Sequence, residues 1–244
     1  MVYLGVDWSD NGWLAVAFDR EGFDHAAVFD EVGELWHRYE ERADRVLVDV
    51  PIGLKEGSGD RACDRLARQV LGPRSEAVVR PPVREATRKR RYPAARRTTE
   101  RIADKRLSRQ AFDISEPVAA LDDLLRNVPA ARAVFAESHP GVCLCAFAGD
   151  PPQHPTQTAG GYAERMRALA TLDTDAPPTV QRVAESVSET GLTVGDVLNA
   201  VALAYTARPG PGPLRSLPPD PPRDQRGLPM GIHYRAVEPL ETTP

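Results

Sequence analysis

The chain has few of the features that mark secreted, membrane-spanning or repetitive proteins. Its 244 residues include three cysteines, Cys63, Cys143 and Cys145, which is too few for a disulfide framework and fits a reducing compartment. No apolar run approaches the roughly 20 residues that a membrane-spanning helix needs. The N-terminus leads directly into a strand-like run, without a basic leader or a cleavage site. We therefore expect a cytoplasmic protein with no membrane partner.

Aromatic residues are also scarce, at 6%, and the sequence contains no internal repeat. The hydrophobic fraction of 41% is enough for a sizeable core, and 27% charged residues are ordinary for a globular domain. A chain of this length can be one large α/β domain or a domain with an insertion. We expect a single domain over residues 1–237 with a helical insertion at about 55–117. A proline-rich connector at 208–224 and a tail at 238–244 complete this organisation.

The net charge of -4 conceals an uneven distribution of charge along the chain. Residues 55–110 contain 17 Lys and Arg but 7 Asp and Glu, so this segment carries about +10 while the rest is acidic. Such a segment indicates a polyanionic partner, although its cations could instead pair with the acidic remainder. Its densest basic run is Arg88, Lys89, Arg90 and Arg91, followed by Tyr92. We interpret this run as a nucleic-acid-binding surface with one stacking aromatic side chain.

Hydrophobic periodicity predicts an α/β fold that begins with three strands. Apolar runs predict strands at 1–7, 12–18, 24–29, 45–50 and 131–136. Asn11-Gly12 is a strong signal for a hairpin between the first two strands. Helical spacing predicts helices at 30–42, 118–126, 161–172 and 194–205. The element order begins β-β-β-α-β, and with the fifth run it predicts a mixed five-stranded sheet with flanking helices.

Two aspartates follow the first and fourth of these apolar runs. Asp7 comes directly after Val2–Val6, and Asp49 comes directly after Val46–Val48. Carboxylates at the carboxyl ends of buried strands lie where ligands bind in open α/β sheets, and two of them side by side repel each other unless a cation lies between them. Carboxylate oxygens suit Mg²⁺ or Mn²⁺. The alternative is that Asp7 caps a turn and Asp49 pairs with an arginine.

Further oxygen ligands are expected from two later segments. Glu137 follows the predicted fifth strand, and Asp196 and Asn199 are three residues apart on one face of the last helix. Strand-end carboxylates together with such a helix face match two-metal chemistry on a phosphodiester. The predicted metal ligands are therefore Asp7, Asp49, Glu137 and Asp196. We expect Asn199 to assist them and His139 to orient water or contact phosphate, unless His139 only stabilises a turn before Pro140.

A zinc site is a weaker alternative for the same region. His139, Cys143, Cys145 and His154 are residue types that bind zinc. Their spacing matches no zinc ribbon or finger, and Cys143 and Cys145 are expected on one face of an extended stretch. Buried inert thiols are the favoured interpretation.

Several motifs resemble the DUF429 family, whose members are regarded as predicted nucleases with an RNase H-like fold. The most specific are the runs Asp49-Val50-Pro51-Ile52-Gly53-Leu54 and Glu137-Ser138-His139-Pro140. Shorter matches are Gly5-Val6-Asp7, Arg61-Ala62-Cys63-Asp64, Val79-Arg80-Pro81-Pro82, Gln110, Gly160 with Arg165, Asp196-Val197-Leu198-Asn199-Ala200 and Gly227-Leu228-Pro229-Met230. The resemblance extends to about Arg235. It implies the same fold and a metal-dependent nuclease activity.

The chain departs from the family pattern at three places. Gly141 stands where members usually carry a glutamate, and Asn199 stands where they usually carry a second acid. The lysine expected before Gly160 is absent from residues 155–158. Two lost negative charges should weaken metal affinity, although an asparagine carbonyl can still bind the ion.

The sequence thus predicts a divalent-metal-dependent nuclease or a related phosphodiester hydrolase that acts on DNA or RNA. One rival is a nucleic-acid-binding protein of the same fold with weakened catalysis. Another is a nucleotide-binding phosphotransferase of actin-like architecture, which would need a second similar domain and a glycine-rich phosphate loop. The segment after Asp7 contains one glycine, Gly12, so this last reading ranks third.

Overall fold

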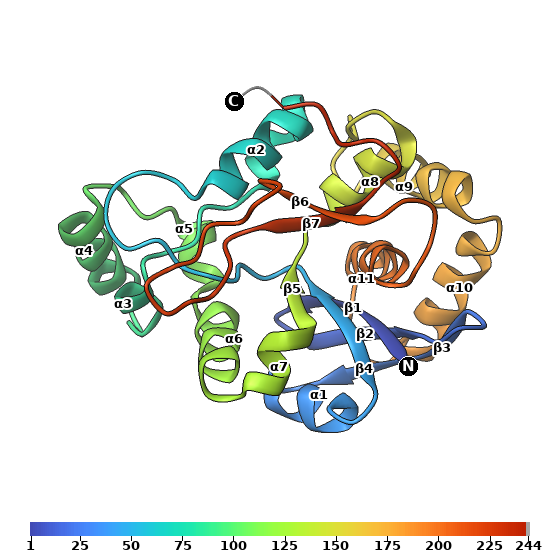
Figure 1. Cartoon of the computed structure of the whole chain (residues 1–244), viewed down its shortest axis with the longest axis horizontal. Coiled ribbons are helices and arrows are strands. Elements are labelled where there is room, and N and C mark those ends of the chain that lie inside the picture. Colours follow the sequence, from blue (N-terminus) through green and yellow to red (C-terminus); the bar gives the residue numbers. More distant parts are fainter. Residues whose placement is uncertain (243–244) are drawn as a thin grey trace.

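A mixed five-stranded sheet forms the centre of the computed structural model, which describes residues 1–242. Its strands are β1 (Val2–Ser9), β2 (Gly12–Phe18), β3 (Phe23–Phe29), β4 (Ala43–Val48) and β5 (Phe135–Glu137). In space the order is β3-β2-β1-β4-β5 (Figure 1). The first three strands are antiparallel neighbours, whereas β4 is parallel to β1 and β5 is parallel to β4. The predicted element order β-β-β-α-β is confirmed, as is the hairpin around Asn11.

Helices occupy most of the remaining chain. They are α1 (Val32–Tyr39), α2 (Ala62–Leu71), the 3₁₀ helix η1 (Gly72–Ala77), α3 (Arg84–Thr87), α4 (Tyr92–Ala103), α5 (Arg109–Asp113), α6 (Ser115–Asn127), α7 (Pro129–Val134), α8 (Pro140–Ala148), α9 (Ala159–Leu172), α10 (Ala176–Ser186) and α11 (Val194–Ala207). A second sheet pairs β6 (Leu214–Leu217) with β7 (Ile232–Arg235). Within residues 1–242, no helix combines the length and the apolar character needed to cross a membrane.

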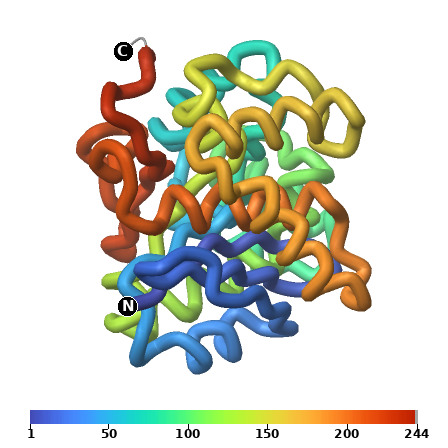
Figure 2. Tube along the Cα trace, turned by 90° about the vertical axis from the view of Figure 1, so that its right-hand side faces the viewer, coloured from blue at the N-terminus to red at the C-terminus, as the bar shows by residue number. Residues whose placement is uncertain are grey.

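The sheet separates two hydrophobic cores because neighbouring strand residues point to opposite faces. Leu4 and Val6 belong to a core that includes residues of α1 and α6, whereas Leu14 and Val16 belong to one built with α10 and α11. Figure 2 shows α11, in orange, lying over the blue strands, with α1 on their other side. The result is three layers, with helices on both faces of the sheet.

Helix α11 lies unusually close to β1 at Gly5. A Cβ atom at this position would lie 2.1 Å from the Ala200 carbonyl oxygen and 2.1 Å from the Ala204 amide nitrogen. Such distances are far inside van der Waals contact, so glycine is required here for the close approach of the two backbones. Asp7 lies two residues beyond Gly5 and therefore faces α11 as well. This contact brings the first aspartate towards the last helix.

Residues 55–117, the segment expected to be a helical insertion, contain α2, η1, α3, α4 and α5, and part of this segment has its own small core. Six buried residues make up that core: Val83, Ala86, Ala95, Ala103, Leu107 and Ala111. In Figure 1, α3 and α4 project to the left of the sheet, and in this view α6 lies between them and the strands. The insertion therefore extends the molecule beyond the carboxyl ends of β1 and β4.

The predicted fifth strand at 131–136 is wrong over most of its length. Residues Pro129–Val134 form helix α7, and the strand consists of Phe135–Glu137 alone. Proline is favoured in the first turn of a helix, and the alanines that follow have high helix propensity. The expected extended stretch around Cys143 and Cys145 is also wrong, because both residues lie in helix α8.

Two elements near the C-terminus differ from the prediction. Helix α10 was not predicted, and the proline-rich connector at 208–224 contains strand β6. Long-range pairing with β7 stabilises that strand, which short-range patterns cannot show. In the predicted tail at 238–244, the Leu240 amide donates to the Tyr234 hydroxyl at 3.1 Å. Residues 243–244 of that tail lie outside the described residues.

Candidate active site

Six of the predicted site residues line one cavity of about 280 Å³ at the edge of the main sheet. They come from β1, the β4–α2 loop, β5, the start of α8 and α11. The six are Asp7, Asp49, Glu137, His139, Asp196 and Asn199. We refer to this space as the aspartate cavity. Residues up to 192 positions apart in the sequence thus meet at one place, although their roles differ.

Asp7 and Asp49 lie beside each other because β1 and β4 are parallel neighbours. Val6 is paired with Val48, and each aspartate follows its strand's paired valine. The Asp49 amide donates to the Val6 carbonyl at 3.0 Å, which continues the ladder by one bond. Asp7 is buried at 5% exposure, whereas Asp49 is half-buried.

Asp196 and Asn199 reach the cavity from the first turns of α11. The Asp196 carboxylate accepts a hydrogen bond from the Thr193 amide at 2.7 Å, and the Thr193 hydroxyl accepts one from the Asp196 amide at 3.3 Å. This capping box stabilises the N-terminus of α11 and restricts the Asp196 side chain. Asn199 forms a side-chain hydrogen bond with Asp7.

The aspartate cavity is unfavourable for negative charge. Burial raises the pKa of Asp7 well above its usual range, and the charges of Asp49 and Asp196 raise it further, although the Asn199 hydrogen bond lowers it. Burial also raises the pKa of Asp49, against the lowering effect of His139. Desolvation and like charges both disfavour the ionised form of a carboxyl group. A cation bound between these groups would relieve both effects.

Glu137 differs from the three aspartates because it already has a cationic partner. Arg61 donates to its two carboxylate oxygens at 2.8 and 2.7 Å, and the Ile52 amide donates to one of them at 2.7 Å. Arg61 also contacts Asp64 at 2.6 and 3.0 Å. All three charged side chains are at least 95% buried. Burial raises the pKa of Glu137 to about 7, although Arg61 lowers it.

A second group of possible metal ligands surrounds Arg61. The ligand atoms of Cys63, Asp64 and Glu137 all lie within 4.8 Å of one another, which is the only such trio among residues 1–242. The Arg61 guanidinium contacts both carboxylates of this trio. Burial raises the pKa of the Cys63 thiol well above its usual range, so the thiolate that metals require is disfavoured. The group fits a guanidinium better than a metal ion.

His139 lies at the N-terminus of α8, half-buried at the wall of the cavity. Its Nδ1 accepts a hydrogen bond from the Gly141 amide at 3.1 Å, so Nε2 carries the proton in the neutral ring. Nε2 lies 3.4 Å from the Ala77 carbonyl oxygen. A Cβ at Gly141 would lie 3.1 Å from the His139 ring, so glycine leaves room for this arrangement.

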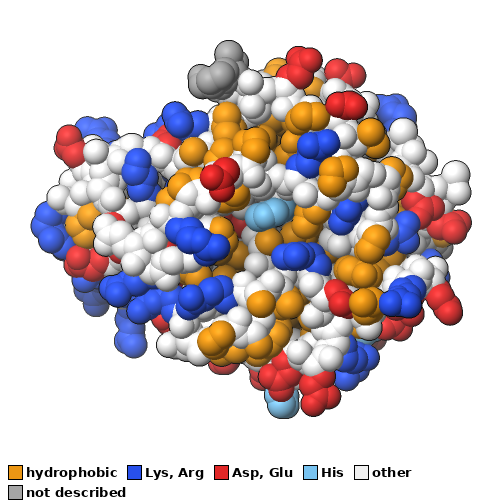
Figure 3. Space-filling model, in the orientation of Figure 1, with side chains coloured by type: hydrophobic (Ala, Val, Ile, Leu, Met, Phe, Trp, Pro, Cys, Tyr) orange, Lys and Arg blue, Asp and Glu red, His pale blue; other side chains and the backbone are white. Residues whose placement is uncertain are grey.

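The basic run at 88–92 lies away from the residues that line the aspartate cavity. Arg88 contacts Asp123 at 2.5 and 2.7 Å and Asp122 at 3.3 Å, and Lys89 lies 3.5 Å from Glu85. Tyr92 donates its hydroxyl to the Leu107 carbonyl at 2.8 Å and packs under Arg109. Arg90 and Arg91 are exposed and, within residues 1–242, have no acidic partner at ion-pair distance. Figure 3 shows Lys and Arg side chains gathered over this part of the surface.

The four residues of the alternative zinc site do not form a ligand group within the described chain. Cys143 and Cys145 are buried in α8, where burial raises the pKa of each thiol to about 11. His154 is exposed and contacts Glu164 at 2.7 Å.

Several charged residues near the site were not identified as functional from the sequence. Arg61 and Asp64 are three residues apart at the start of α2, a spacing that suggests an ion pair but gives no sign of Glu137. The Asp60 carboxylate forms ion pairs with Arg68, Arg80 and Lys105. These contacts join segments up to 45 residues apart, so no local signal could have shown them.

Comparisons with known proteins give one match. The family model described as "Protein of unknown function (DUF429)" matches residues 5–223. A search of curated proteins and a search of solved structures found no match. The matched segment contains every predicted site residue and all residues that line the aspartate cavity except Ile232. The chain therefore belongs to the DUF429 family.

Proposed function

We propose that this protein is a divalent-metal-dependent nuclease or a related phosphodiester hydrolase with an RNase H-like fold. The observation that carries the proposal is the convergence of Asp7, Asp49 and Asp196, with Asn199, on one small cavity. The spatial strand order β3-β2-β1-β4-β5 and the order β-β-β-α-β along the chain support the fold assignment. Fold alone does not decide function, whereas the chemistry of the cavity restricts which reactions the protein can catalyse.

The donor types that line the aspartate cavity suit Mg²⁺ or Mn²⁺, although within residues 1–242 no three of Asp7, Asp49, Asp196 and His139 have ligand atoms within 4.8 Å of one another. Carboxylate and amide oxygens are the ligands that these hard cations prefer, and Mg²⁺ usually combines one or two carboxylates with water. In this proposal Asp7, Asp49 and Asp196 hold the metal and Asn199 contributes its carbonyl oxygen. Glu137 is already compensated by Arg61, so we assign it to positioning the 52–54 segment through the Ile52 amide.

A bound divalent cation would polarise the phosphoryl oxygen and lower the pKa of a bound water. The chain's own residues would complete the site. The carboxylates hold the negative charge that binds the cation, and the His139 Nε2 proton can be donated to a phosphate oxygen. The capping box keeps Asp196 in one orientation, which limits the reorganisation needed on binding.

The test is metal-dependent cleavage by wild type and Asp49→Asn. Labelled single strands, duplexes and branched junctions are incubated with Mg²⁺ or Mn²⁺, and products are resolved on gels. The variant removes one ligand charge and should lose at least about 100-fold in rate, since a charged group that acts in the transition state commonly contributes several kcal/mol. Asp10→Asn, in the exposed β1–β2 turn, is the matched control and should cleave like wild type.

Equal cleavage by wild type and Asp49→Asn would refute the proposed site. Circular dichroism and thermal unfolding of each variant establish that both remain folded. Binding of nucleic acid without cleavage, with every metal tested, would instead favour the second candidate, a binding protein with weakened catalysis. The observation favouring that candidate is Asn199, a neutral residue that hydrogen-bonds Asp7 within the cavity. Within residues 1–242 the second sheet has two strands, so nothing favours the actin-like alternative.

A further inference from the structure

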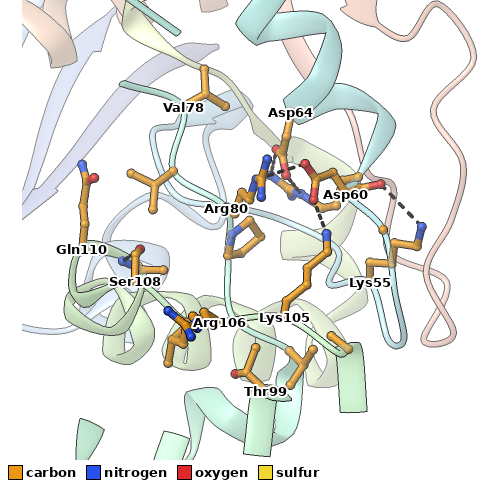
Figure 4. A pocket seen from close by; sticks show the side chains of 18 of the residues that line it. Lys55, Asp60, Asp64, Val78, Arg80, Thr99, Lys105, Arg106, Ser108 and Gln110 are labelled. Atoms are coloured by element: carbon orange, nitrogen blue, oxygen red, sulfur yellow. Dashed lines mark hydrogen bonds and ion pairs between the residues drawn. The ribbon is translucent and has the colours of Figure 1, made fainter. Parts of the chain in front are cut away.

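A second cavity, of about 390 Å³, adjoins the aspartate cavity. Residues common to both linings are Arg61, Asp64, Val78, Val79 and Gln110. Its cations come from three parts of the insertion: the loop after β4, helix α2 with the segment after it, and the loop between α4 and α5. The five that are not engaged with Glu137 are Lys55, Arg68, Arg80, Lys105 and Arg106. We refer to this space as the basic cavity (Figure 4).

The Asp60 carboxylate is the ion-pair partner of three of these five cations. Arg80 and Arg68 lie 3.0 and 3.2 Å from the Asp60 carboxylate, and Lys105 also contacts it. Figure 4 shows Arg80 and Lys105 directed towards Asp60. Burial raises the pKa of Asp60, but the Lys105 hydrogen bond and the charges of Arg80 and Arg68 bring it below its usual value. Three cations around a single negative charge leave an excess of two positive charges.

The remaining side chains add to this excess. Within residues 1–242, Lys55 and Arg106 have no carboxylate at ion-pair distance, and Lys55 reaches only the Asp60 backbone carbonyl, at 3.5 Å. Glu76, which also lines the cavity, pairs with Arg74 at 2.7 Å. Arg61 is compensated by Asp64 and Glu137. The cavity therefore attracts anions, with a net charge of about +4 from the five cations and Asp60.

The size and lining of the basic cavity restrict the kind of anion. Its volume lies within the range of about 300–1,000 Å³ that is typical of small-molecule sites, which is too small for a nucleic-acid duplex. No aromatic side chain occurs among the residues lining it. Bases bound without sequence preference usually stack on aromatic rings, so this lining suits phosphates rather than bases.

We propose that the basic cavity binds the phosphate backbone of a single nucleic-acid strand whose neighbouring phosphodiester lies in the aspartate cavity. This inference rests on the proposed function, because it needs the two cavities to share one substrate. It assigns the backbone contacts to Arg80, Lys105 and Arg106. The run at 88–91 contributes less to binding of the phosphate backbone, because Arg88 and Lys89 are already paired with acids.

The test compares double variants that each remove two positive charges. Arg80→Gln with Arg106→Gln changes the basic cavity, whereas Arg65→Gln with Arg97→Gln changes exposed arginines of the same insertion that do not line it. A third pair, Arg90→Gln with Arg91→Gln, changes the basic run. Binding of a fluorescent 12-nucleotide strand is measured in EDTA from about 50 to 200 mM salt. Because no metal is present, the result does not depend on catalysis.

The cavity pair should bind about tenfold more weakly or worse, since two charge-assisted contacts are lost. Its log–log salt slope should become shallower by about 1.4, that is, about 0.7 for each phosphate contact. The control pair should bind like wild type. Strands of different base composition should lose affinity alike, because phosphate contacts carry no base information.

Three results would overturn the inference. These are equal slopes for wild type and the cavity pair, a slope change confined to the Arg90 and Arg91 pair, and a wild type that binds no strand. Inorganic phosphate alone provides a further check. If it raises the unfolding temperature of wild type but not of the cavity pair, while no strand binds, the occupant is a small phosphate compound. Failure here leaves the Asp49→Asn cleavage test unaffected, so the two proposals are judged separately.

Discussion

At the level of single residues, the buried carboxylates fall into two kinds: Glu137 and Asp64 have a cation beside them, whereas Asp7 has none within residues 1–242. Glu137 and Asp64 share the Arg61 guanidinium, which satisfies both groups in a buried network. Asp7 has two carboxylates nearby and one amide, Asn199. A buried charge without a partner is costly, so the ionised Asp7 carboxylate destabilises the folded protein when no metal is bound.

Asp7→Asn should therefore stabilise the metal-free protein as pH rises. The folded-state pKa of Asp7 is raised above its ordinary value of 3.8, so the folded wild type binds more protons than the unfolded chain and loses stability with rising pH. The gain of the variant should be near zero below about pH 4 and largest at neutral pH. Thermal unfolding in EDTA from pH 4 to 8 measures it, and about 1 kcal/mol corresponds to about 2–4 °C.

The exposed-turn variant Asp10→Asn serves as the control and should show no gain that grows with pH. A destabilised Asp7→Asn at pH 8 would contradict the prediction. It would mean that the ionised carboxylate is stabilised by a partner in the folded state. Addition of Mg²⁺ should reverse the order of stabilities, because metal binding favours the folded wild type.

At the level of elements, the contact between β1 and α11 decides whether the cavity forms. Strand β1 carries Asp7, α11 carries Asp196 and Asn199, and Gly5 allows the two backbones to meet. The parallel pairing of β1 with β4 then adds Asp49. Three elements therefore position all the oxygen ligands of the proposed site.

Gly5→Ala should destabilise the protein by about 3 kcal/mol or more, at or above the upper end for overpacking, because the new Cβ meets backbone atoms that cannot rotate away. The same change at Gly33 in α1 is the matched control. A Cβ there meets no atom within 4 Å, and alanine has the higher helix propensity, so a gain of up to about 1 kcal/mol is expected. Urea unfolding of both variants checks the difference. A Gly5 variant as stable as wild type would contradict the close packing.

At the level of the whole molecule, the C-terminal segment connects the insertion to the sheet domain. The Asp224 side chain is fully buried, and one of its oxygens accepts bonds from Arg84 at 2.5 Å and from the Leu54 amide at 3.0 Å. Its other oxygen accepts from the amides of Arg226 and Leu228 at 2.8 and 2.9 Å. One carboxylate thus joins three parts of the chain.

Asp224→Asn should destabilise the protein by about 1–3 kcal/mol at neutral pH, because it weakens a charge-assisted hydrogen bond to Arg84, which keeps Asp122 and Glu56 as ion-pair partners. Burial raises the pKa of Asp224, but the Leu54 and Arg84 hydrogen bonds bring it below its ordinary value of 3.8. The carboxylate therefore stabilises the fold fully above that value, and this contribution is lost as pH falls through the lowered pKa. Denaturant unfolding at pH 7 and pH 3 should show a large difference that shrinks in acid. Asp220→Asn, exposed in the same segment, should change little.

Local sequence patterns were sufficient for the parts of this protein that form from adjacent residues. Apolar runs predicted the first four strands, and the aspartates that follow two of these runs were expected at the edge of the sheet. Helical spacing also put Asp196 and Asn199 on one face of α11, where both line the cavity. These signals work because strand and helix periodicity depend on neighbouring backbone geometry.

Only the tertiary structure decided which charges are paired. Glu137 pairs with Arg61, 76 positions away, and Arg88 pairs with Asp123, 35 positions away. Because these partners are distant in the sequence, Glu137 was predicted as a metal ligand and Arg88 as a cation available to nucleic acid. Strand β6 likewise exists because β7 pairs with it across a proline-rich loop. The reason is physical: periodicity reports which face of an element is buried, whereas packing over the whole chain selects the partner of each buried charge and each edge strand.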